Sequence, residues 1–178
     1  MPIEKSAGAV IFYRADKKVD EYSFISPRRS APVIEYLLLH YQSGHWDFPK
    51  GNIEKGEKLE ETVKREIKEE TGIGDIGLIP GFKETIEYFY KLKGQSIFKI
   101  VVFYLAQTQT KEVKISWEHI GYKWLPYQEA IAQLTFKNAK EILKKANEFL
   151  FQNNPHRKGV GETLRFPRVG KQPTEGGR

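Results

Sequence analysis

The sequence predicts one domain of mixed α and β structure. Its 178 residues fall within the size range of a single domain. Hydrophobic residues make up 39% and aromatic residues 13% of the chain, which is enough to build a buried core. Short apolar runs typical of strands occur together with segments whose apolar residues recur at helical spacing. These observations favour an α/β (α+β) domain over a disordered chain.

Strand-like runs rich in β-branched and aromatic residues lie along most of the chain. We expect strands at 7–14, 34–41, 83–92, 96–108 and 122–125. The second run, IEYLLLHY, is almost continuously apolar, which suits a strand buried on both faces. The polar stretch 15–33 predicts an insertion loop, and the Gly-rich segment 74–82 predicts a connecting loop. KLKGQS, between the runs 83–92 and 96–108, predicts a hairpin turn.

Three segments have helical patterns. Leu59, Val63 and Ile67 recur at i, i+4 and i+8, so we expect a helix over 59–71. Gly51 and Gly72 bracket it where the backbone needs freedom, with Gly72 as the C-cap. A second helix is expected over 127–134, with Pro126 in its first turn. A third, over 136–151, has one apolar stripe, formed by Phe136, Ala139, Ile142, Leu143, Ala146 and Phe149.

Charge and composition divide the chain near residue 152. The net charge is +6, which suits an anionic partner such as a nucleotide or nucleic acid. Six basic and two acidic residues give the segment 151–178 a net charge of +4. We therefore expect a domain at 1–151 and a flexible basic tail at 152–178. The tail could bind nucleic acid, but a solvated end is the simpler interpretation.

Some classes of protein are disfavoured by composition. The chain has no cysteine, so it has no disulfide, no thiolate nucleophile and no cysteine-based zinc site. Its first residues contain no apolar segment of signal-peptide type, and no run is long enough to span a membrane. We expect a cytoplasmic protein that does not act at a membrane.

Carboxylates are concentrated on one side of the expected helix at 59–71. At 100° per residue, Glu66, Glu69 and Glu70 lie within about 100° of one another, beside the apolar stripe. Carboxylates this close repel one another, and they are tolerated as ligands of a hard cation such as Mg²⁺ or Mn²⁺. Arg65 could orient one of them. By itself, however, the helical pattern favours an ordinary solvated surface helix.

The spacing of residues 51–73 decides between these interpretations. Seven fixed and two aliphatic positions agree with the Nudix box, so the chain resembles the Nudix hydrolase family. These positions are Gly51, Glu57, Arg65, Glu66, Ile67, Glu69, Glu70, Gly72 and Ile73.

The resemblance implies a Nudix α/β/α sandwich with a mixed β-sheet between helices. It also implies Mg²⁺ dependence, with Mn²⁺ as a possible substitute, and hydrolysis of a nucleoside diphosphate linked to another group. In the family, the glutamates that match Glu66, Glu69 and Glu70 bind the metal. Arg65 would orient one of them, and Glu57 would support the fold of the loop and helix.

The flanking segments resemble the asymmetrical diadenosine tetraphosphate hydrolases of the animal and archaeal type. The matching segments cover most of residues 5–150: SAGAVIF, IEYLLLHY, HWDFPKGNIEKGE, GFKETIEYFY, WEHIGYKWL and AIAQLTFKNAKEILKKANEFL. This resemblance implies a small-molecule nucleotide substrate, and specifically cleavage of diadenosine tetraphosphate into ATP and AMP.

The same resemblance implies cationic contacts to the phosphates. His45 and Lys50 flank the loop that enters the helix, where a cation stabilises charge as the anhydride breaks. His40 is a further candidate, and Lys91, Lys93 or Lys99 would supply another contact. Judged without the family, His45 could equally be a turn histidine packed on Trp46, and His40 a polar residue at the sheet edge.

Two aromatic residues match rings that stack on adenine in the family, namely Tyr88 and Phe136. Such a stack is worth roughly 1–3 kcal/mol per base. The alternatives are a sheet-face aromatic for Tyr88 and a core residue on the helical stripe for Phe136. ADP-ribose hydrolases of the family carry a proline near the position of Tyr88, and this chain has none between Gly81 and Leu125. ADP-ribose is therefore disfavoured as a substrate.

Two carboxylates are candidates for the general base that takes a proton from the attacking water. Glu118 matches a loop glutamate that assists metal or water in the family, so either Glu69 or Glu118 could take the proton.

Two other functions share the box: an RNA 5′-end pyrophosphohydrolase, which the basic tail would suit, and a non-catalytic nucleotide sensor. The intact box argues against the sensor. Diphosphoinositol polyphosphates would call for a denser Lys/Arg cluster.

Overall fold

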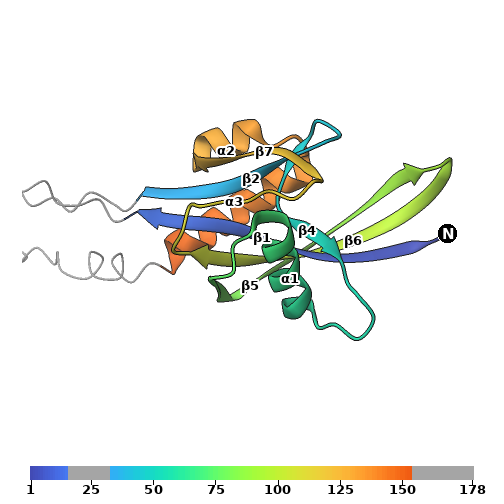
Figure 1. The fold of residues 1–178 in the computed structure, drawn as a ribbon, viewed down its shortest axis with the longest axis horizontal. Helices are drawn as coiled ribbons and strands as arrows, with labels where there is room; N and C mark the ends of the chain where they lie inside the picture. Colours follow the sequence, from blue (N-terminus) through green and yellow to red (C-terminus); the bar gives the residue numbers. More distant parts are fainter. Residues whose placement is uncertain (16–32, 154–178) are drawn as a thin grey trace, which may run out of the picture.

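Within residues 1–15 and 33–153, which a computed structural model describes, seven strands form one sheet and three helices cover it (Figure 1). The strands are β1 (Ile3–Ala15), β2 (Val33–Tyr41), β3 (Trp46–Asp47), β4 (Lys50–Asn52), β5 (Ile76–Leu92), β6 (Gln95–Thr108) and β7 (His119–Pro126). The helices are α1 (Leu59–Thr71), α2 (Tyr127–Gln133) and α3 (Lys137–Gln152). The expected insertion loop lies outside the described residues except for its two end residues, 15 and 33, and the expected basic tail except for residues 152 and 153.

The sheet is mixed and centred on β1. Its main order is β3-β2-β1-β6-β5, with β4 also paired to β1 and β7 to β2. β1 runs parallel to β6 and antiparallel to both β2 and β4. β5 and β6 form a long antiparallel hairpin that projects beyond the helices (Figure 1).

Alternating side chains give each face of the sheet its own core. On the face covered by α1, Ile11 and Leu39 pack with Val63 and Ile67. On the opposite face, α2 and α3 cover a larger core that includes Phe103. Helices on both faces of a mixed sheet confirm the expected α/β/α sandwich (Figure 1).

Two expectations about segments beside the strands were wrong. β5 already begins at Ile76, so the Gly-rich segment 74–82 is largely strand rather than loop. Its pairing with β6 shifts register between Leu78 and Lys83, and Pro80 is tolerated here because β5 lies at the sheet edge. Pro126 lies outside the first turn of α2, because it ends β7 and is the N-cap of the helix.

The helices agree with their periodicity except at one end. α1 spans 59–71, as expected, and Gly72 caps it in the left-handed conformation with φ of 72°. α3 buries Ala139, Ile142, Leu143, Ala146 and Leu150. Phe136 is the N-cap of α3 and is 45% exposed, so it does not belong to the buried stripe.

Candidate active site

Arg65 ties the loop before α1 to the helix. Its Nε donates to Oε1 of Glu57 at 2.7 Å, and its Nη2 donates to Oε2 of Glu57 and to the Asn52 carbonyl oxygen, both at 3.0 Å. Thr62 adds a hydroxyl donor to the same carboxylate. The hydrogen bonds from Arg65 and Thr62 lower the pKa of Glu57 to about 2. Glu57 is therefore an anchor for the loop and helix, as its place in the box implies.

The same guanidinium group reaches the carboxylate side of α1. Its Nη1 donates to Oε1 of Glu66 at 2.7 Å and to Oε2 of Glu69 at 3.1 Å. Glu66 is 8% exposed, whereas Glu69 is exposed to solvent. Burial raises the pKa of Glu66, and the hydrogen bond from Arg65 opposes this rise.

Glu70 is the most deeply buried of the three carboxylates, with 5% exposure. Burial raises its pKa to about 8, and repulsion from Glu66 and Glu118 adds to the rise, while Lys50 opposes it. The backbone N–H of Lys50 donates to its Oε2 at 3.1 Å. Buried negative charge of this kind is what a divalent cation would offset, and carboxylate oxygens are suitable ligands for it.

In the described residues, Glu66, Glu69 and Glu70 do not surround one common metal position. Among the residues that the structure describes, no three acidic or histidine side chains converge on a single metal position. One nitrogen of the Arg65 guanidinium group donates to both Glu66 and Glu69. All three carboxylates offer oxygen ligands of the kind that a divalent cation takes, and two of them, Glu66 and Glu70, are buried.

The expected Glu118 joins this face through the connection between β6 and β7. The backbone N–H groups of Lys114 and Ser116 donate to the carbonyl oxygens of Thr71 and Glu70, at 2.8 and 3.1 Å. These bonds hold the connection against the C-terminal end of α1. Glu118 itself is exposed, and its charge raises the pKa of both Glu66 and Glu70. Its carboxylate therefore lies within electrostatic reach of the α1 carboxylates.

Lys50 is held by two neighbours. Its Nζ lies 2.9 Å from Oδ2 of Asp47 and donates to the Tyr41 hydroxyl at 3.3 Å. Burial alone would lower the pKa of Lys50, but Tyr41 and Asp47 raise it above its ordinary value. Lys50 thus keeps its charge in a largely buried position, which is the state that a phosphate contact requires.

Tyr41, which the sequence did not single out, connects several of these groups. Its ring stacks on His45, with centroids 4.4 Å apart and planes at 12°, and meets the edge of His119 at 4.3 Å. Its hydroxyl donates to the Phe48 carbonyl oxygen at 2.9 Å. The ring of His45 also lies 5.1 Å from that of Phe136. Tyr41 therefore links Lys50 to His45 and, through His45, to the ring of Phe136 at the start of α3.

The ring that packs on Trp46 is not that of the histidine considered for that place from the sequence. His40, not His45, stacks on Trp46, with centroids 4.4 Å apart. His45 instead packs between Tyr41 and Phe136, and its Nδ1 lies 2.7 Å from the Ser43 hydroxyl oxygen. Burial lowers the pKa of His45, and Lys50 adds to this shift.

The remaining predicted residues lie on the β5–β6 hairpin. Tyr88 is half-buried against the larger core, and burial raises its pKa. Within the described chain its ring lies near Tyr90 and makes no direct aromatic pair with Phe136. The ammonium group of Lys99 is shared between Glu4 and Asn52, each at 3.2 Å. Lys99 is thus already paired with groups of the protein.

His119 is a neighbour of the site that sequence reasoning missed. Its Nε2 lies 4.0 Å from Oε2 of Glu70 and has no hydrogen-bond partner in the described residues. Its Nδ1 lies 3.0 Å from the Ser116 hydroxyl oxygen. Burial, followed by the charge of Lys50, lowers its pKa to about 4. The only sequence signal was its position beside Glu118 in WEHIGYKWL.

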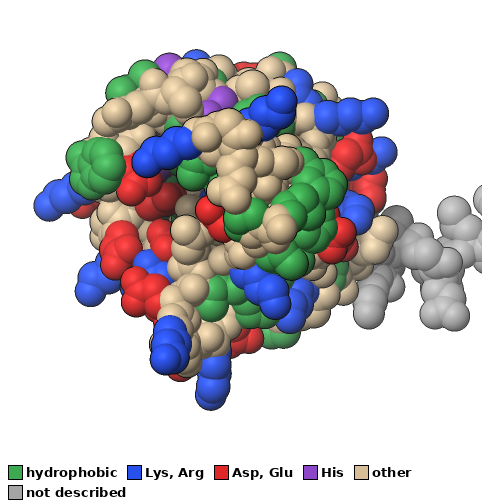
Figure 2. Space-filling model, turned by 90° about the vertical axis from the view of Figure 1, so that its right-hand side faces the viewer, with side chains coloured by type: hydrophobic (Ala, Val, Ile, Leu, Met, Phe, Trp, Pro, Cys, Tyr) green, Lys and Arg blue, Asp and Glu red, His purple; other side chains and the backbone are tan. Residues whose placement is uncertain are grey.

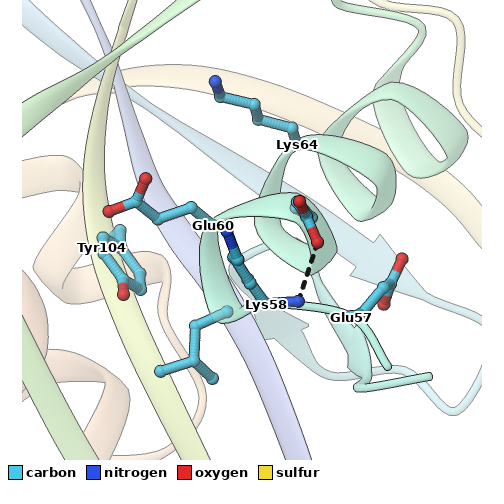
Figure 3. Close-up of a pocket in the computed structure, with 7 residues that line it drawn as sticks. Glu57, Lys58, Glu60, Lys64 and Tyr104 are labelled. Carbon is cyan, nitrogen blue, oxygen red and sulfur yellow. Dashed lines mark hydrogen bonds between the residues drawn. The ribbon is translucent and has the colours of Figure 1, made fainter. Parts of the chain in front are cut away.

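The molecular surface shows where acidic side chains gather and where a groove lies. Seen from the end toward which the hairpin points, acidic side chains gather on the side of α1, with basic side chains among them (Figure 2). A separate groove at the start of α1 lies beside Lys58, Glu60, Lys64 and Tyr104 (Figure 3). None of Glu66, Glu69 and Glu70 lines this groove, although Glu57, which holds Arg65, lies at its edge.

The mixed sandwich and the Arg65-anchored helix of carboxylates define the Nudix class of hydrolases. Residues 5–146 match the NUDIX domain, and the chain belongs to this family.

Similar proteins narrow the class further. The asymmetrical bis(5′-nucleosyl)-tetraphosphatase of Mus musculus is 34% identical over 152 residues, which cover 82% of this chain and 95% of the relative. A crystal structure of a C. elegans Ap4A hydrolase binary complex aligns with a TM-score of 0.66 and 30% identity, covering 84% of this chain and 98% of that one. The RNA pyrophosphohydrolase of Nitratiruptor sp. is 34% identical over 116 residues, covering 58% of this chain and 72% of the relative. The chain is therefore a Nudix hydrolase closely related to Ap4A hydrolases.

Of the helices that the structure describes, none has the length and hydrophobicity of a membrane span.

Proposed function

We propose that the protein hydrolyses dinucleoside polyphosphates and splits diadenosine tetraphosphate into ATP and AMP in the presence of Mg²⁺. One observation carries this proposal. The carboxylate side of α1 lies beside the largely buried Lys50. Lys50 contacts Tyr41, and the ring of Tyr41 stacks on His45. His45 in turn lies beside the exposed ring of Phe136. Anion-binding groups thus lie between a candidate cation site and a surface on which a base can stack.

In this proposal, Glu66, Glu69 and Glu70 hold the cation, and Arg65 orients Glu66. When bound there, Mg²⁺ offsets the charge of the phosphate chain and activates the attacking water. Glu69, whose carboxylate accepts a hydrogen bond from Arg65 at 3.1 Å, would exchange this contact for the cation, while Arg65 would stay bonded to Glu57. Mn²⁺ is expected to substitute, because it accepts the same oxygen ligands.

The proton leaves through a carboxylate of the chain. Glu69 and Glu118 are both exposed, and either can take the proton from water as its oxygen bonds to a phosphorus atom. The anhydride bond on the other side of that phosphorus breaks, and its electron pair leaves with the departing nucleotide. Lys50, His45, His40 and Lys99 are the candidates for stabilising the phosphate oxygens. Glu57 acts indirectly, by holding Arg65.

Tyr88 and Phe136 are proposed to hold an adenine ring. Phe136 is available because it lies outside the buried stripe of α3. Tyr88 packs on the larger core, close enough to Lys50 for its pKa to respond to that charge. Stacking on these rings would distinguish a nucleotide from inorganic polyphosphate.

The deciding assay measures Mg²⁺-dependent release of ATP from diadenosine tetraphosphate, with 5′-triphosphorylated RNA and ADP-ribose as competing substrates. We expect the dinucleotide to give the highest kcat/KM. Faster turnover of the RNA would favour the RNA pyrophosphohydrolase alternative, which the Nitratiruptor relative supports. No turnover of any phosphoanhydride would leave the nucleotide-sensor alternative.

A matched pair of variants tests the site itself. Glu69→Gln should remove most turnover, at least about 100-fold, while the circular dichroism spectrum stays that of the folded protein. Glu60→Gln is the control, because Glu60 lies on the same helix but lines the separate groove. Near-normal activity of Glu69→Gln with Mg²⁺ would contradict the assignment.

The division into a domain at 1–151 and a basic tail, binding of nucleic acid by that tail and the cytoplasmic location stay predictions.

A further inference from the structure

Trp117 is exposed without an evident structural role. It lies in the connection between β6 and β7 and is 80% exposed, more than any other large hydrophobic side chain in residues 1–15 and 33–153. The other two tryptophans have structural partners: Trp46 stacks on His40, and Trp124 donates a hydrogen bond to the Lys111 carbonyl oxygen. Among the described residues, no aromatic ring or cation packs on the Trp117 indole at close range.

The backbone around Trp117 is nevertheless fixed. The side-chain amide of Gln42 donates to the Trp117 carbonyl oxygen, and the backbone N–H of Gln42 donates to that of Glu118 at 3.1 Å. On the other side, the N–H of Ser116 bonds to the carbonyl oxygen of Glu70. The indole is therefore presented to solvent from a backbone that loses little further freedom on binding.

These bonds also place Trp117 at the rim of the carboxylate face. Its neighbour Glu118 acts on the charges of Glu66 and Glu70. Gln42 follows Tyr41 and begins the turn that carries His45. Trp117 thus bonds to the turn after β2 through Gln42, while its neighbour Ser116 bonds to the backbone of the last turn of α1.

A dinucleoside polyphosphate brings two bases to such a site. Tyr88 and Phe136 are assigned to one of them, which leaves the second base without a stacking surface. A flat, exposed aromatic ring suits a purine, because stacking depends on the face of the base and not on a pattern of hydrogen bonds. We infer that Trp117 is the stacking surface for the second nucleobase of a dinucleoside polyphosphate. This inference rests on the proposed function.

Two substrates with the same number of phosphates test it. Diadenosine tetraphosphate has two bases, and adenosine 5′-tetraphosphate has one. Trp117→Ala should raise KM for the dinucleotide about ten-fold at little change in kcat, and should leave KM for the mononucleotide unchanged. Trp117→Phe should recover most of the loss, because it keeps a ring. Phe151→Ala is the control, an exposed aromatic residue on the last turn of α3.

Fluorescence gives a second readout that does not require turnover. Titration with diadenosine tetraphosphate in the absence of a divalent cation should quench an emission component that Trp117→Phe lacks. Equal changes in KM for both substrates, or none for either, would overturn the role of Trp117 while leaving the proposed function intact. If the wild-type protein cleaves neither substrate, the proposed function fails, and the inference fails with it.

Discussion

At Gly51, the absence of a side chain leaves the space that the Glu66 carboxylate occupies. A Cβ atom at this position would lie 2.0 Å from Oε1 and Cδ of Glu66. Gly51 is not among the glycines with positive φ, so it is needed for space and not for backbone freedom, contrary to the sequence-based expectation. Gly72, by contrast, does need its left-handed conformation.

Gly51→Ala should therefore displace the carboxylate of Glu66 without unfolding the protein. We expect turnover to fall by more than about ten-fold, because a misplaced ligand loses transition-state stabilisation. Steady-state kinetics and the apparent affinity for Mg²⁺ measure the effect. Gly77→Ala is the matched control, since a Cβ there meets nothing within 4 Å. Wild-type kinetics in Gly51→Ala would show that Glu66 does not act from its observed position.

Single residues also show the limit of reading a sequence. Glu66, Glu69 and Glu70 were predictable because helical spacing and the box place them on one helix side. Tyr41 and His119 were not, because they reach the site only through contacts between distant parts of the chain. The expected place of Phe136 on the apolar stripe was wrong, since helical periodicity does not reveal that the helix begins one residue later.

At the scale of elements, the loop and helix from Gly51 to Thr71 behave as one unit because Glu57 and Arg65 clamp them together. The capping box at the start of α1 adds a second link, in which the N–H of Lys58 donates to Glu61 at 2.9 Å (Figure 3). The clamp depends on an ionised Glu57, so it should respond to acid.

The pH dependence of stability follows from the lowered pKa of Glu57. Its pKa is about 2 in the folded protein against an ordinary 4.5, so ionised Glu57 stabilises the fold fully above about 4.5. This contribution is lost as the pH falls from there toward 2. Glu57→Gln should lower Tm at neutral pH and flatten its decline in acid. Thermal unfolding followed by circular dichroism measures both, with Glu60→Gln as control; parallel curves for Glu57→Gln and wild type would contradict the clamp.

Elements were predictable where the local signal was unambiguous. The bounds of α1 follow from its apolar stripe and Gly72. The first part of β5 was missed because Gly77, Pro80 and Gly81 are typical of loops, and only pairing with β6 makes this stretch a strand. Its edge position, which tolerates a proline, is a property of the sheet and not of the segment.

At the scale of the whole molecule, the site is assembled from segments far apart in the sequence. The side of α1, the turn after β2, the connection between β6 and β7 and the start of α3 all contribute to it. Local patterns predicted most of these segments, but not the parallel pairing of β1 with β6 that arranges the sheet. The family resemblance implied a mixed sheet, but not which of its strands pair in parallel.

Cation binding should stabilise the whole fold. Repulsion among the buried carboxylates costs free energy in the metal-free protein, and a ligand that binds only the folded state raises its stability. We expect Mg²⁺ to raise Tm, EDTA to reverse the rise, and Glu70→Gln to reduce it. Calorimetry or fluorescence-detected unfolding measures this, with Ca²⁺ and Na⁺ as controls for specificity and ionic strength. The same rise in Glu70→Gln as in wild type would place the cation elsewhere.

The hydrogen bonds that join Lys114 and Ser116 to the end of α1 also limit where insertions and deletions can be accepted during evolution. An insertion or deletion between Ser116 and Glu118 would move that glutamate relative to the α1 carboxylates, so the length of this stretch should be fixed among functional descendants. The turn at Lys93 and Gly94 joins the exposed ends of β5 and β6, and a change of length there disturbs neither Glu118 nor the carboxylates of α1. One connection is held to a fixed length by the chemistry, while the other is free to vary.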